Sequence, residues 1–209
     1  MTILVIGANG RVGKQLCTLA AQGGVEVRAM VRHRAEEPLF DEQGIETAQG
    51  DLEGGFHEAM EGCDQVVFAA GSGSHTSSDR TLLVDLHGAI RSIELAETLG
   101  VSRFIMVSAL RAMDPLAAPE RLRPFMAAKY AADLVLRRSA VPHLILRPGK
   151  LTDEEASGLV TTVPDQMPNI TVSRGNVARV LLAIVRNRDL VNREIALVDG
   201  DTPIDTALV

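Results

Sequence analysis

Aromatic residues are scarce in this sequence: only 3% of its 209 residues are Phe, Trp or Tyr, and Trp is absent. Hydrophobic residues nevertheless make up 46% of the chain. We therefore expect a core of aliphatic side chains, which is typical of α/β proteins and excludes a disordered or coiled chain. A chain of this length is expected to form one domain with a substantial core.

Cysteines and long apolar runs are also few. The two cysteines, Cys17 and Cys63, lack the spacing of a metal site, as expected in a reducing cytosol. We predict no metal centre, and we interpret Cys17, inside a predicted helix, as a packing residue. No uncharged apolar run approaches the ~18 residues of a membrane span. Met1 leads directly into a predicted strand and leaves no room for a signal peptide, so we predict a cytoplasmic protein.

Positive charge is not in excess: 21 Lys and Arg against 27 Asp and Glu give a formal net charge of −6 and a pI near 5.4. This balance argues against nucleic acid or an anionic membrane as partner. Basic residues that bind a ligand must therefore act locally, and we expect the partner to be a small-molecule substrate.

The first thirty-odd residues carry the most informative pattern. Residues 2–6 (TILVI) are a short β-branched apolar run, residues 7–13 (GANGRVG) a glycine-rich turn, residues 14–21 a helical pattern, and residues 25–31 a second strand. A strand, a glycine-rich turn, a helix and a second strand in this order predict the βαβ unit that binds dinucleotides. The alternative is a glycine-rich turn in some other α/β protein.

Each glycine of the turn has a predicted purpose. Gly7 permits a sharp turn off the strand, Gly10 lets the backbone approach a pyrophosphate, and Gly13 lets the helix pack closely. The helix N-terminus then offers unpaired N–H groups and partial positive charge to the phosphates. The predicted cofactor contacts in the turn are Gly7, Asn9, Gly10, Arg11, Val12 and Gly13.

The end of the second strand indicates which dinucleotide is bound. Proteins that prefer NAD usually carry a carboxylate there, whereas this chain continues Arg32-His33-Arg34. A guanidinium can bind a 2′-phosphate in a two-pronged contact, so we predict NADP(H) over NAD(H), with Arg32 as the main contact. His33 and Arg34 are secondary candidates and Arg11 a further one. A solvated cluster of charges is the alternative.

Strand and helix patterns then alternate to the end of the chain. Strands are predicted over residues 44–52, 65–71, 103–108, 143–147 and 194–198, and helices over 53–62, 80–99, 125–139 and 174–186. This alternation predicts one α/β domain, a doubly wound parallel sheet with helices on both faces. Residues 158–172 are expected to hold short strands and turns.

The turn GANGRVG and the strand ending in VR resemble the short-chain dehydrogenase/reductase superfamily, most of all its atypical branch of small NAD(P)H-binding, epimerase-like and flavin-reductase-like proteins. The resemblance covers nearly the whole chain and implies a Rossmann fold. It also implies further cofactor contacts: Asp51 and Leu52 at the adenine, Ala69, Ala70 and Gly71 beneath the ribose, and Pro148 and Gly149 beside the nicotinamide. For Asp51 and Leu52 a plain turn is the alternative.

The resemblance also implies a catalytic side, and there the sequence departs from the family. Ser108 stands at the serine position of the fifth strand, Asp85 replaces an Asn, and Lys129 is the lysine of YxxxK. Phe125 stands where the tyrosine belongs and has no ionisable proton. Lys129 is then expected to contact the nicotinamide ribose and Ser108 the nicotinamide or substrate. For Ser108 the alternative is a strand-end hydroxyl bonded to backbone. For Asp85 the alternative is a buried, hydrogen-bonded helix residue.

Loss of the tyrosine narrows the expected function. A sugar epimerase or alcohol dehydrogenase must move a hydroxyl proton as well as a hydride, whereas a flavin, quinone or similar ring takes hydride directly. We therefore expect an NADPH-dependent reductase of a small conjugated acceptor, with residues 151–172 as roof of its pocket. A non-catalytic NADP(H)-binding sensor and an epimerase or dehydratase are the alternatives. His75 is a weaker candidate proton donor, with a solvent-exposed loop histidine as the alternative. Asp153 is interpreted as capping and solvation, and the resemblance suggests a homodimer.

Overall fold

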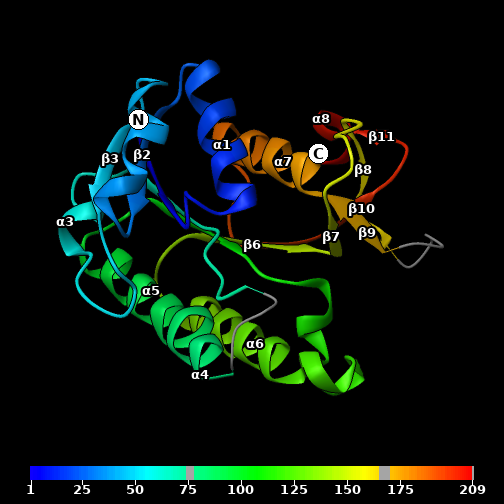
Figure 1. Cartoon of the computed structure of the whole chain (residues 1–209). Coiled ribbons are helices and arrows are strands. Elements are labelled where there is room, and N and C mark those ends of the chain that lie inside the picture. Colours follow the sequence, from blue (N-terminus) through cyan, green and yellow to red (C-terminus); the bar gives the residue numbers. More distant parts are fainter. Residues whose placement is uncertain (74–77, 165–169, 209) are drawn as a thin grey trace.

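The predicted strands form one sheet in the computed structural model, which describes residues 1–73, 78–164 and 170–208. Nine strands of this part of the chain lie in the order β11-β8-β10-β6-β5-β4-β1-β2-β3 (Figure 1). Their bounds are β1 (Thr2–Ile6), β2 (Glu26–Val31), β3 (Glu46–Gln49), β4 (Gln65–Phe68), β5 (Arg103–Val107), β6 (His143–Pro148), β8 (Leu159–Thr161), β10 (Arg193–Asp199) and β11 (Thr202–Pro203).

Neighbouring strands from β3 to β10 are parallel, which confirms the doubly wound parallel sheet. The edge differs from the prediction, because β8 pairs antiparallel with both β10 and β11. A separate short pair is formed by β7 (Lys150–Thr152) and β9 (Thr171–Ser173). The short strands expected over residues 158–172 are therefore present, and β8 extends the main sheet.

Strand β1 shows why helices cover both faces. Ile3 and Val5 pack with residues of α1 (Arg11–Gln22) and α7 (Arg174–Arg186), whereas Leu4 and Ile6 pack with residues of α5 (Ala89–Thr98) and α6 (Arg123–Arg138). Because successive side chains of a strand point to opposite faces, a continuous apolar run predicts burial on both. Figure 1 shows α1 and α7 on one side of the sheet and α5 and α6 on the other.

Short helical segments join these elements. They are η1 (Arg34–Glu36), α2 (Pro38–Asp41), α3 (His57–Met60), α4 (Ser78–Arg80), η3 (Leu110–Met113), η4 (Pro115–Ala117), η5 (Glu120–Leu122) and α8 (Ile204–Ala207). The helix predicted over 53–62 is reduced to α3, because Gly54 and Gly55 precede it. No helix in the described ranges is long and apolar enough to cross a membrane.

The helix predicted over residues 80–99 is not a single α-helix. Between α4 and α5 the chain forms a π-helical segment, η2 (Thr81–Gly88). The wider turns coincide with Asp85, which is fully buried, and with Gly88, where a Cβ would lie 2.9 Å from Leu52 Cβ. Interruptions of this kind are often found at functional sites.

Both cysteines are free and buried. Cys17 packs in the core between α1 and the sheet, and burial raises the pKa of its thiol to about 12. The interpretation of Cys17 as a packing residue is therefore confirmed.

Candidate functional site

The glycine turn between β1 and α1 has no room for side chains at two of its glycines. Gly7 has φ +86°, and a Cβ there would lie 2.6 Å from the Cα of Ala70 at the end of β4. A Cβ on Gly13 would lie 2.2 Å from the Gly7 carbonyl oxygen. The backbone of the turn is therefore held against both α1 and β4, as the glycine pattern predicts.

The N-terminus of α1 is open. Gly10 is the N-cap and has no side chain with which to cap the helix, and the first turn of α1 contains no acidic residue. Its first N–H groups and the positive end of its dipole therefore remain available to an anion. Such a terminus beside a glycine turn fits the phosphates of a dinucleotide.

A cleft of about 260 Å³ opens beside this turn. We call it the nucleotide cleft; its lining residues are Gly7, Asn9, Gly10, Met30, Arg32, Glu36, Gly50, Asp51, Leu52, Ala69, Ala70, Gly71 and Val84. The sequence predicted most of them, and the sheet order brings them together from β1, β2, β3 and β4. Asn9 Oδ1 is buried here without a hydrogen-bond partner among the described residues, so the cleft contains an acceptor for a ligand.

Arg32 and Glu36 lie together in this cleft. The exposed Arg32 side chain donates from Nε to His33 Nε2 at 3.2 Å and forms no ion pair with a described carboxylate. The sequence reasoning missed Glu36, although its position three residues after His33 matches a capping box. Partial burial alone would raise the pKa of Glu36, but hydrogen bonds from the His33 N–H, the Asn9 amide and the Arg32 N–H outweigh it and lower the pKa.

Several other predicted contacts lie outside the cleft lining. Arg11 forms an ion pair of 2.7 Å with Asp153, which also binds Arg174 at 2.6 Å. Asp153, interpreted as capping and solvation, is 64% exposed, follows β7, and joins the N-terminal ends of α1 and α7 through these two arginines. Val12 is buried in the core and Gly13 packs on Gly7.

Two predicted contacts have roles within the protein. Asp51 Oδ1 accepts the Glu53 N–H at 3.0 Å, so Asp51 stabilises a turn and also lines the cleft. Gly149 follows Pro148 at the end of β6, and its Cβ would lie 2.1 Å from the Ile170 carbonyl oxygen. Packing thus explains Gly149, and its contact with nicotinamide stays a prediction.

Lys129 is buried beside the cleft. Its Nζ lies 3.3 Å from the carbonyl oxygens of Ala70 and Val107 and 3.3 Å from Asp85 Oδ1. The other oxygen of Asp85 accepts the Ser72 N–H at 2.9 Å. The two carbonyls accept hydrogen bonds from the ammonium, whereas Asp85 Oδ1 is an ion-pair partner without a hydrogen bond among the described residues. The third ammonium proton is therefore the one that the expected contact to a ribose would use.

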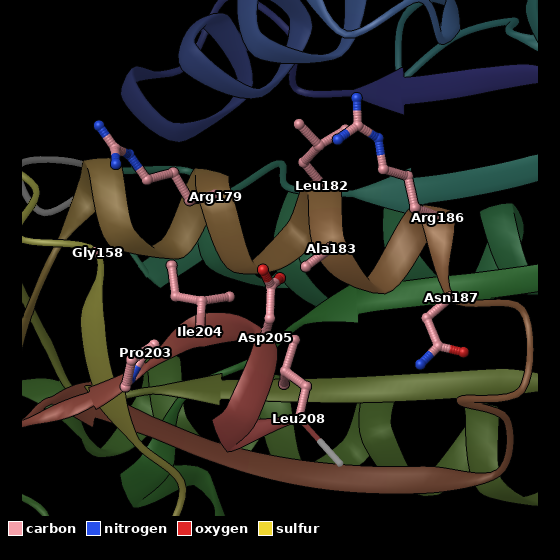
Figure 2. A pocket seen from close by; sticks show the side chains of 10 residues that line it. All are labelled: Gly158, Arg179, Leu182, Ala183, Arg186, Asn187, Pro203, Ile204, Asp205 and Leu208. Atoms are coloured by element: carbon pink, nitrogen blue, oxygen red, sulfur yellow. The ribbon is translucent and has the colours of Figure 1, made fainter.

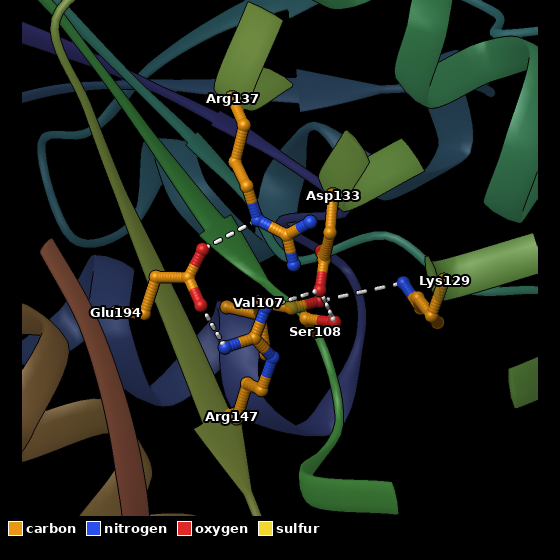
Figure 3. Close-up of polar contacts among 7 residues, drawn as sticks. All are labelled: Val107, Ser108, Lys129, Asp133, Arg137, Arg147 and Glu194. Carbon is orange, nitrogen blue, oxygen red and sulfur yellow. Dashed lines mark hydrogen bonds and ion pairs between the residues drawn. The ribbon is translucent and has the colours of Figure 1, made fainter. Parts of the chain in front are cut away.

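Ser108 belongs to a buried polar network (Figure 3). Its hydroxyl donates to Asp133 Oδ2 at 2.8 Å, and the same oxygen accepts Arg147 Nη2 at 2.9 Å. Arg147 also donates to Glu194 at 2.5 Å, and Glu194 accepts Arg137 at 2.5 Å. The hydroxyl is therefore bonded to a carboxylate and not to backbone, the alternative considered from the sequence.

Asp133 was not predicted, although it lies four residues after Lys129 on the helical spacing of Phe125 and Lys129. Burial raises the pKa of Asp133, against the hydrogen bond from Ser108 and the charge of Arg147. Phe125 is partly buried, with its ring centre 5.7 Å from Lys129 Nζ, and Tyr130 is exposed. Tyr130 therefore does not take the place of the missing phenol. His75 lies outside the described residues.

A larger hollow of about 620 Å³ lies between α7 and α8 (Figure 2). It carries the side chains of Arg179, Arg186 and Asp205 around the apolar Leu182 and Ile204. Gly158, from the predicted pocket roof, lines it, but none of the predicted cofactor-binding or catalytic residues does, so its size does not make it the site.

The fold and the nucleotide cleft define an NAD(P)H-binding protein, and comparison with known proteins gives the family. A model of the NAD(P)H-binding family matches residues 7–188, so the chain belongs to that family. A Bacillus subtilis protein named as an uncharacterized sugar epimerase is 40% identical over 212 residues, covering 100% of this chain and 99% of the relative.

Solved structures agree with this assignment. A Bacillus halodurans protein provisionally assigned as an NAD-dependent epimerase/dehydratase has a TM-score of 0.95 at 40% identity, covering 100% of this chain and 98% of its own. A Lactococcus lactis oxidoreductase has a TM-score of 0.86 at 27% identity, with 100% and 95% coverage. The predicted family and its Rossmann-like fold are therefore confirmed.

Proposed function

We propose that the protein is an NADP(H)-dependent reductase of a small conjugated acceptor, such as a quinone or a flavin. The observation that carries the proposal is Phe125 beside Lys129, combined with an intact nucleotide cleft. The bound cofactor supplies a hydride. The turn and the α1 N-terminus hold its pyrophosphate, Arg32 binds the 2′-phosphate, and Ala69 to Gly71 border the ribose.

The missing phenol determines which acceptors are suitable. Reduction of a carbonyl needs a positioned acid at the oxygen, and the Phe125 ring provides none. The Ser108 hydroxyl donates to Asp133, and the buried Lys129 ammonium donates to two backbone carbonyls and pairs with Asp85, so both groups are engaged within the protein. An electron-poor conjugated ring accepts hydride without such an acid and then takes its proton from water.

The same contacts favour a second candidate, a non-catalytic NADP(H)-binding sensor, because they engage Ser108 and Lys129 within the protein. A third candidate comes from the names of the relatives, which include a sugar epimerase and an epimerase/dehydratase. Phe125 argues against it, since epimerisation by hydride transfer needs an acid and base at the sugar hydroxyl.

Ligand-dependent thermal unfolding tests the cofactor. A nucleotide at about a hundred times its dissociation constant stabilises by ~2.7 kcal/mol, and each kcal/mol is worth roughly 2–4 °C for a domain of this size. We expect a clear shift of Tm with NADPH and a smaller one with NADH. Equal shifts would refute the preference for NADP(H), and no shift with either nucleotide would refute the cofactor assignment.

Turnover separates the three candidates. NADPH oxidation is followed with a quinone, with free FMN and with a simple aldehyde, and nucleotide-sugar epimerisation is followed in parallel. The proposal expects turnover with the quinone or FMN and none with the aldehyde. Tight NADPH binding without turnover would identify a sensor, and conversion of the sugar would identify an epimerase.

We also propose a homodimer through the helices that carry Asp85 and Lys129. Support comes from Leu82 and Leu83 on η2 and Tyr130 on α6, which are 56%, 43% and 40% exposed. Exposed apolar side chains grouped on neighbouring helices are typical of interfaces. Light scattering measures the mass directly, and a monomer at every concentration would refute the dimer.

A further inference from the structure

Glu36 places a carboxylate in the part of the cleft where the sequence predicts that Arg32 binds the 2′-phosphate. It lines the nucleotide cleft together with Arg32 and Gly10. Its Oε1 accepts Asn9 Nδ2 at 2.5 Å, and its Oε2 accepts the N–H of Arg32 at 3.0 Å and that of His33 at 3.4 Å. The carboxylate thus joins the glycine turn to the end of β2.

We propose that Glu36 limits the preference for NADP(H) over NAD(H), so that the choice of nucleotide depends on Glu36 and Arg32 together. A 2′-phosphate entering this cleft meets the Arg32 guanidinium and the Glu36 carboxylate at once. The guanidinium attracts the phosphate and the carboxylate repels it, so the two effects offset each other. A ribose 2′-hydroxyl meets no such repulsion and can donate a hydrogen bond to the carboxylate. The inference rests on the proposed cofactor role of the cleft.

The charge of Glu36 is stable near neutral pH, because its hydrogen bonds lower its pKa. Asp51, the other carboxylate of the cleft, accepts the N–H of Glu53. Glu36 is instead bonded to the backbone of Arg32 itself. It therefore acts on the phosphate site and not on the adenine side predicted for Asp51.

The test compares the dissociation constants of NADPH and NADH for the wild type, Glu36→Gln and Glu37→Gln, measured by fluorescence titration without any acceptor. Both substitutions remove one negative charge, but Glu37 does not line the cleft. We expect Glu36→Gln to raise the NADPH preference about tenfold and Glu37→Gln to change it less than about twofold. An unchanged preference in Glu36→Gln, or an equal change in Glu37→Gln, would overturn the inference.

Two further variants separate charge from loop geometry. Glu36→Asp keeps the charge and shortens the side chain, so its preference should stay within about twofold of the wild type. A rise as large as that of Glu36→Gln would assign the effect to the loop and overturn the inference. If Glu36→Gln does not fold, Glu36→Ala is used in its place, because it removes the same charge. Binding of neither nucleotide to the wild type would instead refute the proposed function itself.

Discussion

The Lys129 ammonium lies 5.7 Å from the centre of the Phe125 ring, and the two residues are one turn apart on α6. The lysine therefore stands in the position from which it would lower the pKa of a phenol, but it faces an apolar ring.

Replacing Phe125 by Tyr should restore an acid at this position. A ring in the same place would carry a phenol near a buried cation, which lowers the phenol pKa. We expect NADPH-dependent reduction of a simple aldehyde to rise at least about tenfold, which is less than the roughly hundredfold at the lower end of general acid catalysis. Initial rates of NADPH oxidation measure it.

Phe125→Leu is the matched control for that experiment, because it changes the same side chain without adding a hydroxyl. Its aldehyde activity should equal that of the wild type. A Phe125→Tyr variant that binds NADPH normally but gains no activity would show that Lys129 and Ser108 are not placed for this chemistry.

Asp133 should matter much more to stability than Ser108. Asp133→Ala leaves the buried Arg147 with Glu194 as an acidic partner, so we expect a loss of about 2–3 kcal/mol, below the roughly 3–5 kcal/mol that follows when a buried charge is left uncompensated. Ser108→Ala removes one hydrogen bond while Asp133 keeps Arg147, which costs about 1 kcal/mol. Urea unfolding measures both. Equal losses for the two variants would contradict this description of the network.

Gly13→Ala should disrupt the glycine turn. The added Cβ would lie 2.2 Å from the Gly7 carbonyl oxygen, so α1 or the turn must shift. We expect at least a tenfold loss of NADPH affinity, equivalent to about 1.4 kcal/mol. Gly55→Ala is the matched control, because a Cβ there meets nothing within 4 Å. If both variants bind NADPH like the wild type, the close packing at Gly13 does not support the nucleotide cleft.

Glu194 makes stability depend on pH in a defined direction. Burial alone would raise its pKa, but hydrogen bonds from Arg147 and Arg137 outweigh this and lower it below the ordinary 4.5. As pH falls, the unfolded chain is therefore protonated here before the folded one. Glu194 contributes stability above pH 4.5, and this contribution is lost as pH falls through the lowered pKa.

Thermal unfolding of Glu194→Gln at several pH values tests this direction. The variant should be less stable than the wild type near neutral pH, and the difference in Tm should shrink as the pH falls below 4.5. A difference that grows on acidification would show that the arginines do not stabilise the charged form of Glu194.

The sequence identified the nucleotide side better than the catalytic side. The glycine turn and the positions of Arg32, Asp51 and Ala69 could be predicted, because each of them follows the end of a parallel strand. Parallel strands end at one edge of the sheet, where the residues that follow them meet. Glu36 also lies there; its spacing from His33 matches a capping box, but nothing in the sequence indicates its hydrogen bond with Asn9. On the catalytic side, the motif positions of Ser108 and Lys129 did not reveal which atoms they bond.

The sequence by itself determined the βαβ unit, the alternation of strands and helices and the family, because periodicity, glycine placement and short motifs act between residues close in the chain. Only the tertiary structure decided the buried pairings. Arg147 and Asp133 are 14 residues apart, and Arg147 and Glu194 are 47 apart. Such contacts depend on which strand lies beside which helix. A buried charge must find a partner there, and many arrangements of the same sequence pattern offer different partners.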